Sequence, residues 1–152
     1  MSGDASTADF RRVASAGWAR HLAGNGLDGE LGDQTFETQA DDLHALLDAA
    51  GEAGPYVVVG HSFGGAEAVT FASTYADEVV GLLLLDASPA PWPDTACAVV
   101  DDGSEVAASF QITCGMFEPD GNAERLDAHT AFDLVAQIDS LGDVPLLVAS
   151  AA

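Results

Sequence analysis

The strongest chemical signal in this sequence is the run Gly60-His61-Ser62-Phe63-Gly64. A serine hydroxyl is a weak nucleophile, so an enzyme that uses one must hold its Oγ clear of the backbone and near donors for an oxyanion. The pattern Gly-x-Ser-x-Gly between a buried strand and a helix produces a tight turn that exposes such a serine. The pattern predicts that Ser62 is a nucleophile and that the backbone N–H of Phe63 is an oxyanion donor. We expect the turn to require small residues at positions 60 and 64, where Gly60 and Gly64 stand, because a larger side chain would collide with it.

The segments around this run have the patterns that the turn requires. Residues 55–60 are a short apolar run with three valines, which predicts a strand buried on both faces and therefore a parallel sheet. Residues 65–75 are small and apolar, as in a helix packed on a sheet, and residues 79–85 predict a second buried strand. Strand, helix and strand form a βαβ unit, whose crossover is right-handed in almost every known case.

Further elements follow from periodicity and from stop signals. Apolar residues at spacings of three and four from Ala40 to Ala50 predict a helix, with Thr35 as its N-cap and Gly51 as its stop. The remaining expectations are loop over residues 1–34 with a short strand near 10–16, irregular chain over 87–124, a helix over 125–138 and a third buried strand over 144–149. The length favours one domain.

The run from Pro55 to Gly65, followed by Val79 to Asp86, resembles the central part of the α/β-hydrolase superfamily, in particular its lipase and esterase-like members. The resemblance covers roughly residues 20–150 and implies a partial α/β-hydrolase fold, a parallel sheet with flanking helices. It also places Gly24-Asn25-Gly26 in the loop after the family's fourth strand, and it implies that residues 89–140 are a cap or lid insertion. We expect the chain to be the middle of that fold.

The resemblance implies a catalytic acid at the end of a strand that follows the nucleophile. Asp86 ends the second predicted strand and is the candidate, although an aspartate there could equally cap the turn before Ser88 and Pro89. Asp139 and Asp143 are more distant choices. The third predicted strand is followed by Ser150-Ala151-Ala152, which contains no carboxylate.

The family's catalytic histidine follows an eighth strand, which we expect to lie beyond residue 152. The four histidines present are His21, His44, His61 and His129, and none matches it. On the turn, the side chain of His61 should point away from Ser62, and His44 has Asp48 four residues on, which favours a solvated pair. His129 could reach the pocket from the cap. The His-Gly loop that gives the family's second oxyanion donor has no counterpart before Phe10.

The charge of the chain excludes several classes of partner. There are 25 acidic residues against four arginines and no lysine, a formal net charge of −21. Such a surface repels nucleic acids and anionic membranes and is typical of a solvated acidic face. No acidic cluster has the spacing of a calcium loop, and no Cys/His pattern suggests zinc, so we expect neither a metal nor another cofactor.

The two cysteines, Cys97 and Cys114, are separated by 16 residues. In an oxidising compartment they would form a disulfide worth on the order of 3 kcal/mol, which would favour an extracellular location, and in the cytosol they would be two small buried residues. The first 25 residues show no apolar core of a signal peptide, and no apolar run reaches the roughly 20 residues of a membrane span.

Together, the residues and the resemblance predict a serine hydrolase that cleaves an ester or a related acyl bond through an acyl-enzyme. The cap would line the acyl pocket with Trp92, Phe110, Met116 and Phe117, although an ordinary cap core explains these residues as well. The alternative is a shortened, catalytically inactive relative that acts as a binding module. We expect the chain alone to be a weak catalyst, since the base and one oxyanion donor are missing.

Overall fold

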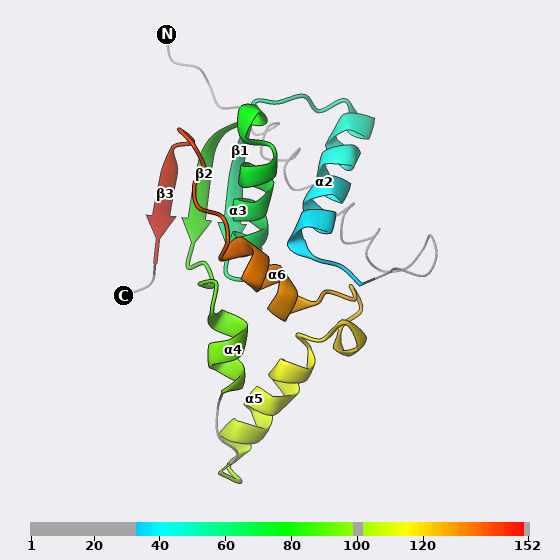
Figure 1. The fold of residues 1–152 in the computed structure, drawn as a ribbon, viewed down its shortest axis with the longest axis vertical. Coiled ribbons are helices and arrows are strands. Elements are labelled where there is room, and N and C mark those ends of the chain that lie inside the picture. Colours follow the sequence, from blue (N-terminus) through cyan, green and yellow to red (C-terminus); the bar gives the residue numbers. More distant parts are fainter. Residues whose placement is uncertain (1–32, 99–101, 151–152) are drawn as a thin grey trace, which may run out of the picture.

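Three parallel strands, in the order β1-β2-β3, form the sheet of the computed structural model (Figure 1). The structure describes residues 33–98 and 102–150, so the strand expected near residues 10–16 and the loop Gly24-Asn25-Gly26 lie outside the described residues. The strands are β1 (Tyr56–His61), β2 (Val79–Leu85) and β3 (Leu146–Ala149). All three were predicted, and β3 begins two residues later than expected.

Helix α2 (Phe36–Ala50) begins and ends where the sequence indicated. The hydroxyl of Thr35 accepts a hydrogen bond from the backbone N–H of Thr38, and the hydroxyl of Thr38 accepts one from the N–H of Thr35, so the two side chains form a capping box. Gly51 ends the helix in the left-handed conformation, with φ of 71°. A residue with a Cβ would be strained at that position, which is why glycine makes an effective stop.

Helix α3 (Gly64–Thr74) follows the Ser62 turn and leads through η1 (Ala76–Glu78) into β2. It packs on β1 and β2, and α2 packs on α3. The shared core is formed by small and aromatic side chains, namely Ala40, Ala68, Phe71, Ala72, Val79 and Leu82. The small residues of α3 let the helix approach the strands closely, which brings its N-terminus to the end of β1.

The expectation that the strands are buried on both faces is wrong for the described residues. Val57 and Val59 of β1 are 61% and 50% exposed, and every residue of β3 is exposed. The physical reason is that α3 covers one face of the sheet, while no element in the described part of the chain packs on the other. The apolar pattern of these strands therefore exceeds what the described helices bury.

Residues 89–140 lie between β2 and β3 in the chain and are called here the helical segment. Their helices lie beyond the carboxyl ends of the strands (Figure 1). The irregular chain expected over residues 87–124 is a wrong prediction, because this part contains two short helices and one 3₁₀ turn. Ser104 caps the second helix by accepting a hydrogen bond from the N–H of Ala107. The elements are α4 (Trp92–Cys97), α5 (Glu105–Gly115) and η2 (Pro119–Gly121).

Helix α6 (Ala128–Val135) ends the helical segment and is shorter than the predicted helix over residues 125–138. It begins after Asp127, whose carboxylate accepts a hydrogen bond from the N–H of Thr130. Its apolar face joins a second core at the start of α2 and α3, formed by Phe36, Ala66, Leu126, Ala131 and Phe132. No helix among the described residues is both long and apolar enough to cross a membrane.

Candidate active site

Ser62 lies in the tight turn between β1 and α3 and has a positive φ of 51°. Few residues other than glycine adopt this conformation, and such strain is concentrated at functional sites. Three backbone hydrogen bonds hold the turn: the N–H of Ser62 donates to the carbonyl of Leu85 at 3.0 Å, and the Ser62 carbonyl accepts from the N–H groups of Gly65 and Ser88, both at 3.0 Å. The turn is thus fixed to α3 and to the end of β2.

The glycines around Ser62 differ in how strictly the turn requires them. A Cβ on Gly60 would lie 2.5 Å from the carbonyl oxygen of Gly64 and 2.7 Å from the Cβ of Ala68, so no side chain fits there. A Cβ on Gly64 would have the carboxylate of Glu67 as its nearest atom, at 4.0 Å. The steric argument therefore holds for Gly60 and is wrong for Gly64. Instead Gly65 is confined, because its Cβ would lie 2.4 Å from that of Ala87.

Phe63 stands at the start of α3, directly after Ser62. Phe63 is the N-cap of α3 and has helical φ and ψ angles of −54° and −41°. Within the described residues, its N–H donates no backbone hydrogen bond. Because the first amides of a helix have no partner inside the helix, and the helix dipole is positive at this end, the position suits a developing negative charge.

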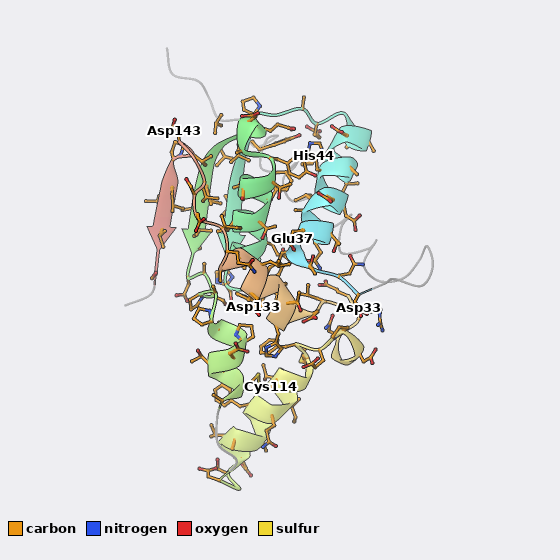
Figure 2. The ribbon with its side chains drawn as sticks, viewed as in Figure 1. Asp33, Glu37, His44, Cys114, Asp133 and Asp143 are labelled. Atoms are coloured by element: carbon orange, nitrogen blue, oxygen red, sulfur yellow. A yellow bond between two sulfur atoms is a disulfide. The ribbon has the colours of Figure 1, made fainter. Side chains whose placement is uncertain are left out.

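Asp86 occupies the equivalent place at the end of the neighbouring strand. His61 and Leu85 are partners in the register of β1 and β2, so Ser62 and Asp86 each follow the last residue of adjacent strands. Asp86 also has a positive φ, of 46°. Its N–H donates a hydrogen bond to the carbonyl of Ala149 at the end of β3. Asp143, by contrast, lies before β3 at the opposite end of the sheet (Figure 2).

No histidine among the described residues is hydrogen-bonded to Ser62. His129 lies at the start of α6, where its Nδ1 is 2.8 Å from Oδ1 of Asp94 in α4. His61 is exposed at the end of β1. His21 lies outside the described residues. The structure therefore brings Ser62 and Asp86 to neighbouring strand ends without a base between them.

His44 belongs to a polar cluster at the other end of α2 (Figure 2). The predicted pair with Asp48 is present at 3.9 Å, but the closer partner is Glu78 of η1, at 3.1 Å. The imidazole stacks on Tyr75 with ring centroids 4.0 Å apart, and the Tyr75 hydroxyl donates to Asp41. Burial and this hydrogen bond raise the pKa of Tyr75 to about 12. The cluster joins α2 to the end of α3 and takes no part in the site.

The four residues expected to line an acyl pocket are not brought together. Phe117 is 7% exposed and its ring lies 5.1 Å from that of Trp92, so these two form a core within the helical segment. Phe110 and Met116 are exposed on or just after α5. The interpretation as an ordinary core thus describes Phe117, while Phe110 and Met116 face solvent. A shallow cavity does exist, but it lies between α2, α3 and β1, on residues that include Gln39 and Phe71.

The fold is an α/β fold with a tight turn at Ser62 between a parallel strand and a helix, and the comparison with known families agrees with this fold class. Residues 16–102 match the family described as the alpha/beta hydrolase fold, and the chain belongs to this family. The resemblance inferred from the run around Ser62 is therefore confirmed, as is the partial α/β-hydrolase fold.

Two curated relatives match part of the chain. Lipase LipV of Mycobacterium tuberculosis (strain ATCC 25618 / H37Rv) is 44% identical over 88 residues, which are 58% of this chain and 30% of LipV. The probable transporter efuK of Hormonema carpetanum is 36% identical over 67 residues, which are 43% of this chain and 10% of efuK. The matched region thus covers less than a third of either relative. No solved structure matches the chain significantly.

Proposed function

We propose that this chain carries the nucleophile of a serine hydrolase that acts on an ester or a related acyl bond. The observation that supports the proposal most is the positive φ of Ser62 in a turn between a parallel strand and a helix. That backbone conformation is costly for serine, and in an enzyme it would present Oγ at the carboxyl end of the sheet. The similarity to a protein named a lipase points to the same class of reaction.

The proposed reaction has two halves. Ser62 Oγ attacks the carbonyl carbon and loses its proton to a histidine base, while the carbonyl oxygen becomes an oxyanion that accepts a hydrogen bond from the amide of Phe63. The C–O bond to the leaving alcohol breaks, and the base returns the proton to that alcohol. Water then attacks the acyl-enzyme by the same route, which releases the acid and restores the hydroxyl of Ser62. No cofactor takes part.

Asp86 is the proposed acid that orients the base. Its place beside Ser62 at the strand ends supports this role, because a carboxylate there could hold an imidazole that spans both positions. The base itself would come from outside the described residues, in keeping with the small share of LipV that the chain covers. We further propose that the helical segment acts as a cap over the strand ends, and that the protein works in an oxidising compartment, where the disulfide between Cys97 and Cys114 persists.

A second candidate function is binding without catalysis. It is favoured by one observation: Ser62 has no histidine hydrogen-bonded to it in the part of the chain that the structure describes. In that case the turn would be a vestige of the family's site, and the chain would act as a binding module.

A serine-directed fluorophosphonate probe separates the two candidates. We would treat the 152-residue chain, and the longest protein that its reading frame encodes, with the probe and locate the adduct by peptide mass spectrometry. Ser62→Ala tests the nucleophile, and Ser73→Ala, near the C-terminal end of α3, is the matched control. Labelling that Ser62→Ala abolishes and Ser73→Ala retains supports the hydrolase. If neither protein is labelled at Ser62 although both are folded, the hydrolase proposal is wrong and the binding function becomes the better account.

A further inference from the structure

The ring of Phe63 is enclosed by aromatic side chains on three sides. Its centroid lies 5.4 Å from that of Phe36 in α2, 5.1 Å from that of Phe132 in α6 and 6.4 Å from that of Phe117 in the helical segment. Phe36 and Phe132 are 0% and 1% exposed, so the ring of Phe63 packs against two fully buried side chains. The pairs with Phe36 and Phe132 are edge-to-face, an arrangement that adds attraction beyond the burial of area. The residue after the proposed nucleophile is therefore held through its side chain.

Phe117 joins the helical segment to this ring. Its centroid lies 5.1 Å from Trp92 in α4 and 6.2 Å from His129 in α6, in addition to the stacked contact with Phe63. Its carbonyl accepts a hydrogen bond from the N–H of Ala128 at 2.9 Å, which ties its backbone to the start of α6. Phe117 thus contacts α4, α6 and the ring of Phe63.

Two further links fix the position of Phe117. The disulfide between Cys97 and Cys114 joins the end of α4 to the end of α5, and the N–H of Phe117 donates to the carbonyl of Cys114 at 3.0 Å. Figure 2 shows Cys114 on the part of α5 that faces α4. The contact between Asp94 and His129 joins α4 to α6. The ring of Phe117 is thus held from both neighbouring helices and presented to Phe63.

We propose that Phe117 is a positioning residue, which acts through the side chain of Phe63 to hold the oxyanion amide and the helical segment in one fixed arrangement. This inference rests on the proposed function. The amide of Phe63 shares its peptide with the carbonyl of Ser62, which accepts two backbone hydrogen bonds. The contact of the Phe63 ring with Phe117 adds a further hold on this residue, so its loss should loosen the peptide without freeing it. A misplacement of about 1 Å in a catalytic group costs on the order of a hundredfold in rate.

Hydrogen exchange tests the physical coupling without any catalysis. We would compare Phe117→Ala with Phe110→Ala, which removes the same side chain from an exposed position of the same segment, and with Phe117→Leu. Phe117→Ala should speed exchange at the amides of Gly65 and Ala66, which donate hydrogen bonds to the turn, by about tenfold or more, relative to those of residues 43–50 at the far end of α2. Phe110→Ala should leave that ratio unchanged, and Phe117→Leu should restore most of the protection. An unchanged ratio in a folded Phe117→Ala protein overturns the proposal.

The catalytic consequence is measured by the rate at which the fluorophosphonate labels Ser62 and, in the longest protein from the reading frame, by the split between kcat and KM. Phe117→Ala should lower the labelling rate and kcat by about tenfold to a hundredfold with little change in KM, and Phe117→Leu should recover most of the loss. A KM effect alone would show that Phe117 only lines the pocket, which overturns the positioning role. If wild-type Ser62 is not labelled, the proposed function fails, whereas the exchange ratio still decides whether Phe117 holds Phe63.

Discussion

Replacing Gly60 by alanine tests the close packing of the turn between β1 and α3 independently of catalysis. The new Cβ would lie 2.5 Å from the carbonyl oxygen of Gly64, 2.7 Å from the Cα of Gly65 and 2.7 Å from the Cβ of Ala68. Real Cβ atoms do not approach other atoms so closely, so the strand and the helix must move apart. None of the three contacts belongs to a flexible side chain that could rotate away.

The cost follows from the nature of those contacts. Overpacking a tight interior by one methyl group costs typically about 1–3 kcal/mol, and more where the surroundings cannot yield. Because all three neighbours are backbone atoms or a Cβ, we expect Gly60→Ala to lower the free energy of unfolding by about 3 kcal/mol. The matched variant Gly64→Ala adds the same methyl group four residues later, where the nearest atom is 4.0 Å away. At the start of a helix this change should be neutral or stabilise by up to about 1 kcal/mol.

Urea unfolding followed by circular dichroism gives both free energies, and the labelling rate of Ser62 gives the effect on the turn. Gly60→Ala should also slow labelling in the fraction that remains folded, since the clash lies two residues before Ser62. If the two alanine variants have equal free energies of unfolding, the close packing of β1 on α3 is not what selects the glycine. The argument that the Ser62 turn requires glycine at position 60 for steric reasons would then be refuted.

Three other predictions concern the helical segment, the α2 cluster and the proposed acid. Reducing the bridge between Cys97 and Cys114 should lower the free energy of unfolding by about 3 kcal/mol, from a loop of 17 residues, as urea curves with and without a reductant would show. The tyrosinate absorbance of Tyr75 should titrate near pH 12, and its pKa should be lower in Asp41→Asn. Because the pKa is higher in the folded protein than in the unfolded chain, the contribution of Tyr75 to stability is complete below about pH 10 and is lost as the pH rises toward 12. Asp86→Gly should keep or raise stability by relieving the positive φ, yet lower the labelling rate of Ser62; a variant that labels normally would leave Asp86 as a turn residue.

Local patterns sufficed for the elements that surround the candidate site. The hydroxyl of Thr35 and the left-handed Gly51 act within a few residues of α2, so their signals are complete in the sequence. Three valines before Gly60 and the small residues after Gly65 likewise define β1 and α3, and the bounds of β2 agree residue by residue. The sequence therefore predicted the features that depend on contacts within one helical turn or one strand.

Contacts between distant parts of the chain were beyond the same reasoning. His44 was assigned to Asp48 on the same helix, while its closer partner Glu78 lies 34 residues away. His129 and Asp94 are 35 residues apart, and nothing in either local sequence indicates the pair. Phe117 was expected to line a pocket or an ordinary core, but its contact with Phe63 was missed for the same reason, since one phenylalanine in a stretch without periodicity carries no signal of its partner.

The assignment of the site finally depends on where backbone strain is found. Three residues other than glycine have a positive φ in the described ranges: Ser62, Asp86 and Arg125. Arg125 has a structural explanation, because its guanidinium contacts Asp33 and Asp120 and thereby joins the start of α2 to the helical segment. Ser62 and Asp86 instead follow residues that are partners in the sheet. Two costly conformations side by side at the carboxyl ends of parallel strands are better explained by one shared task than by two unrelated turns.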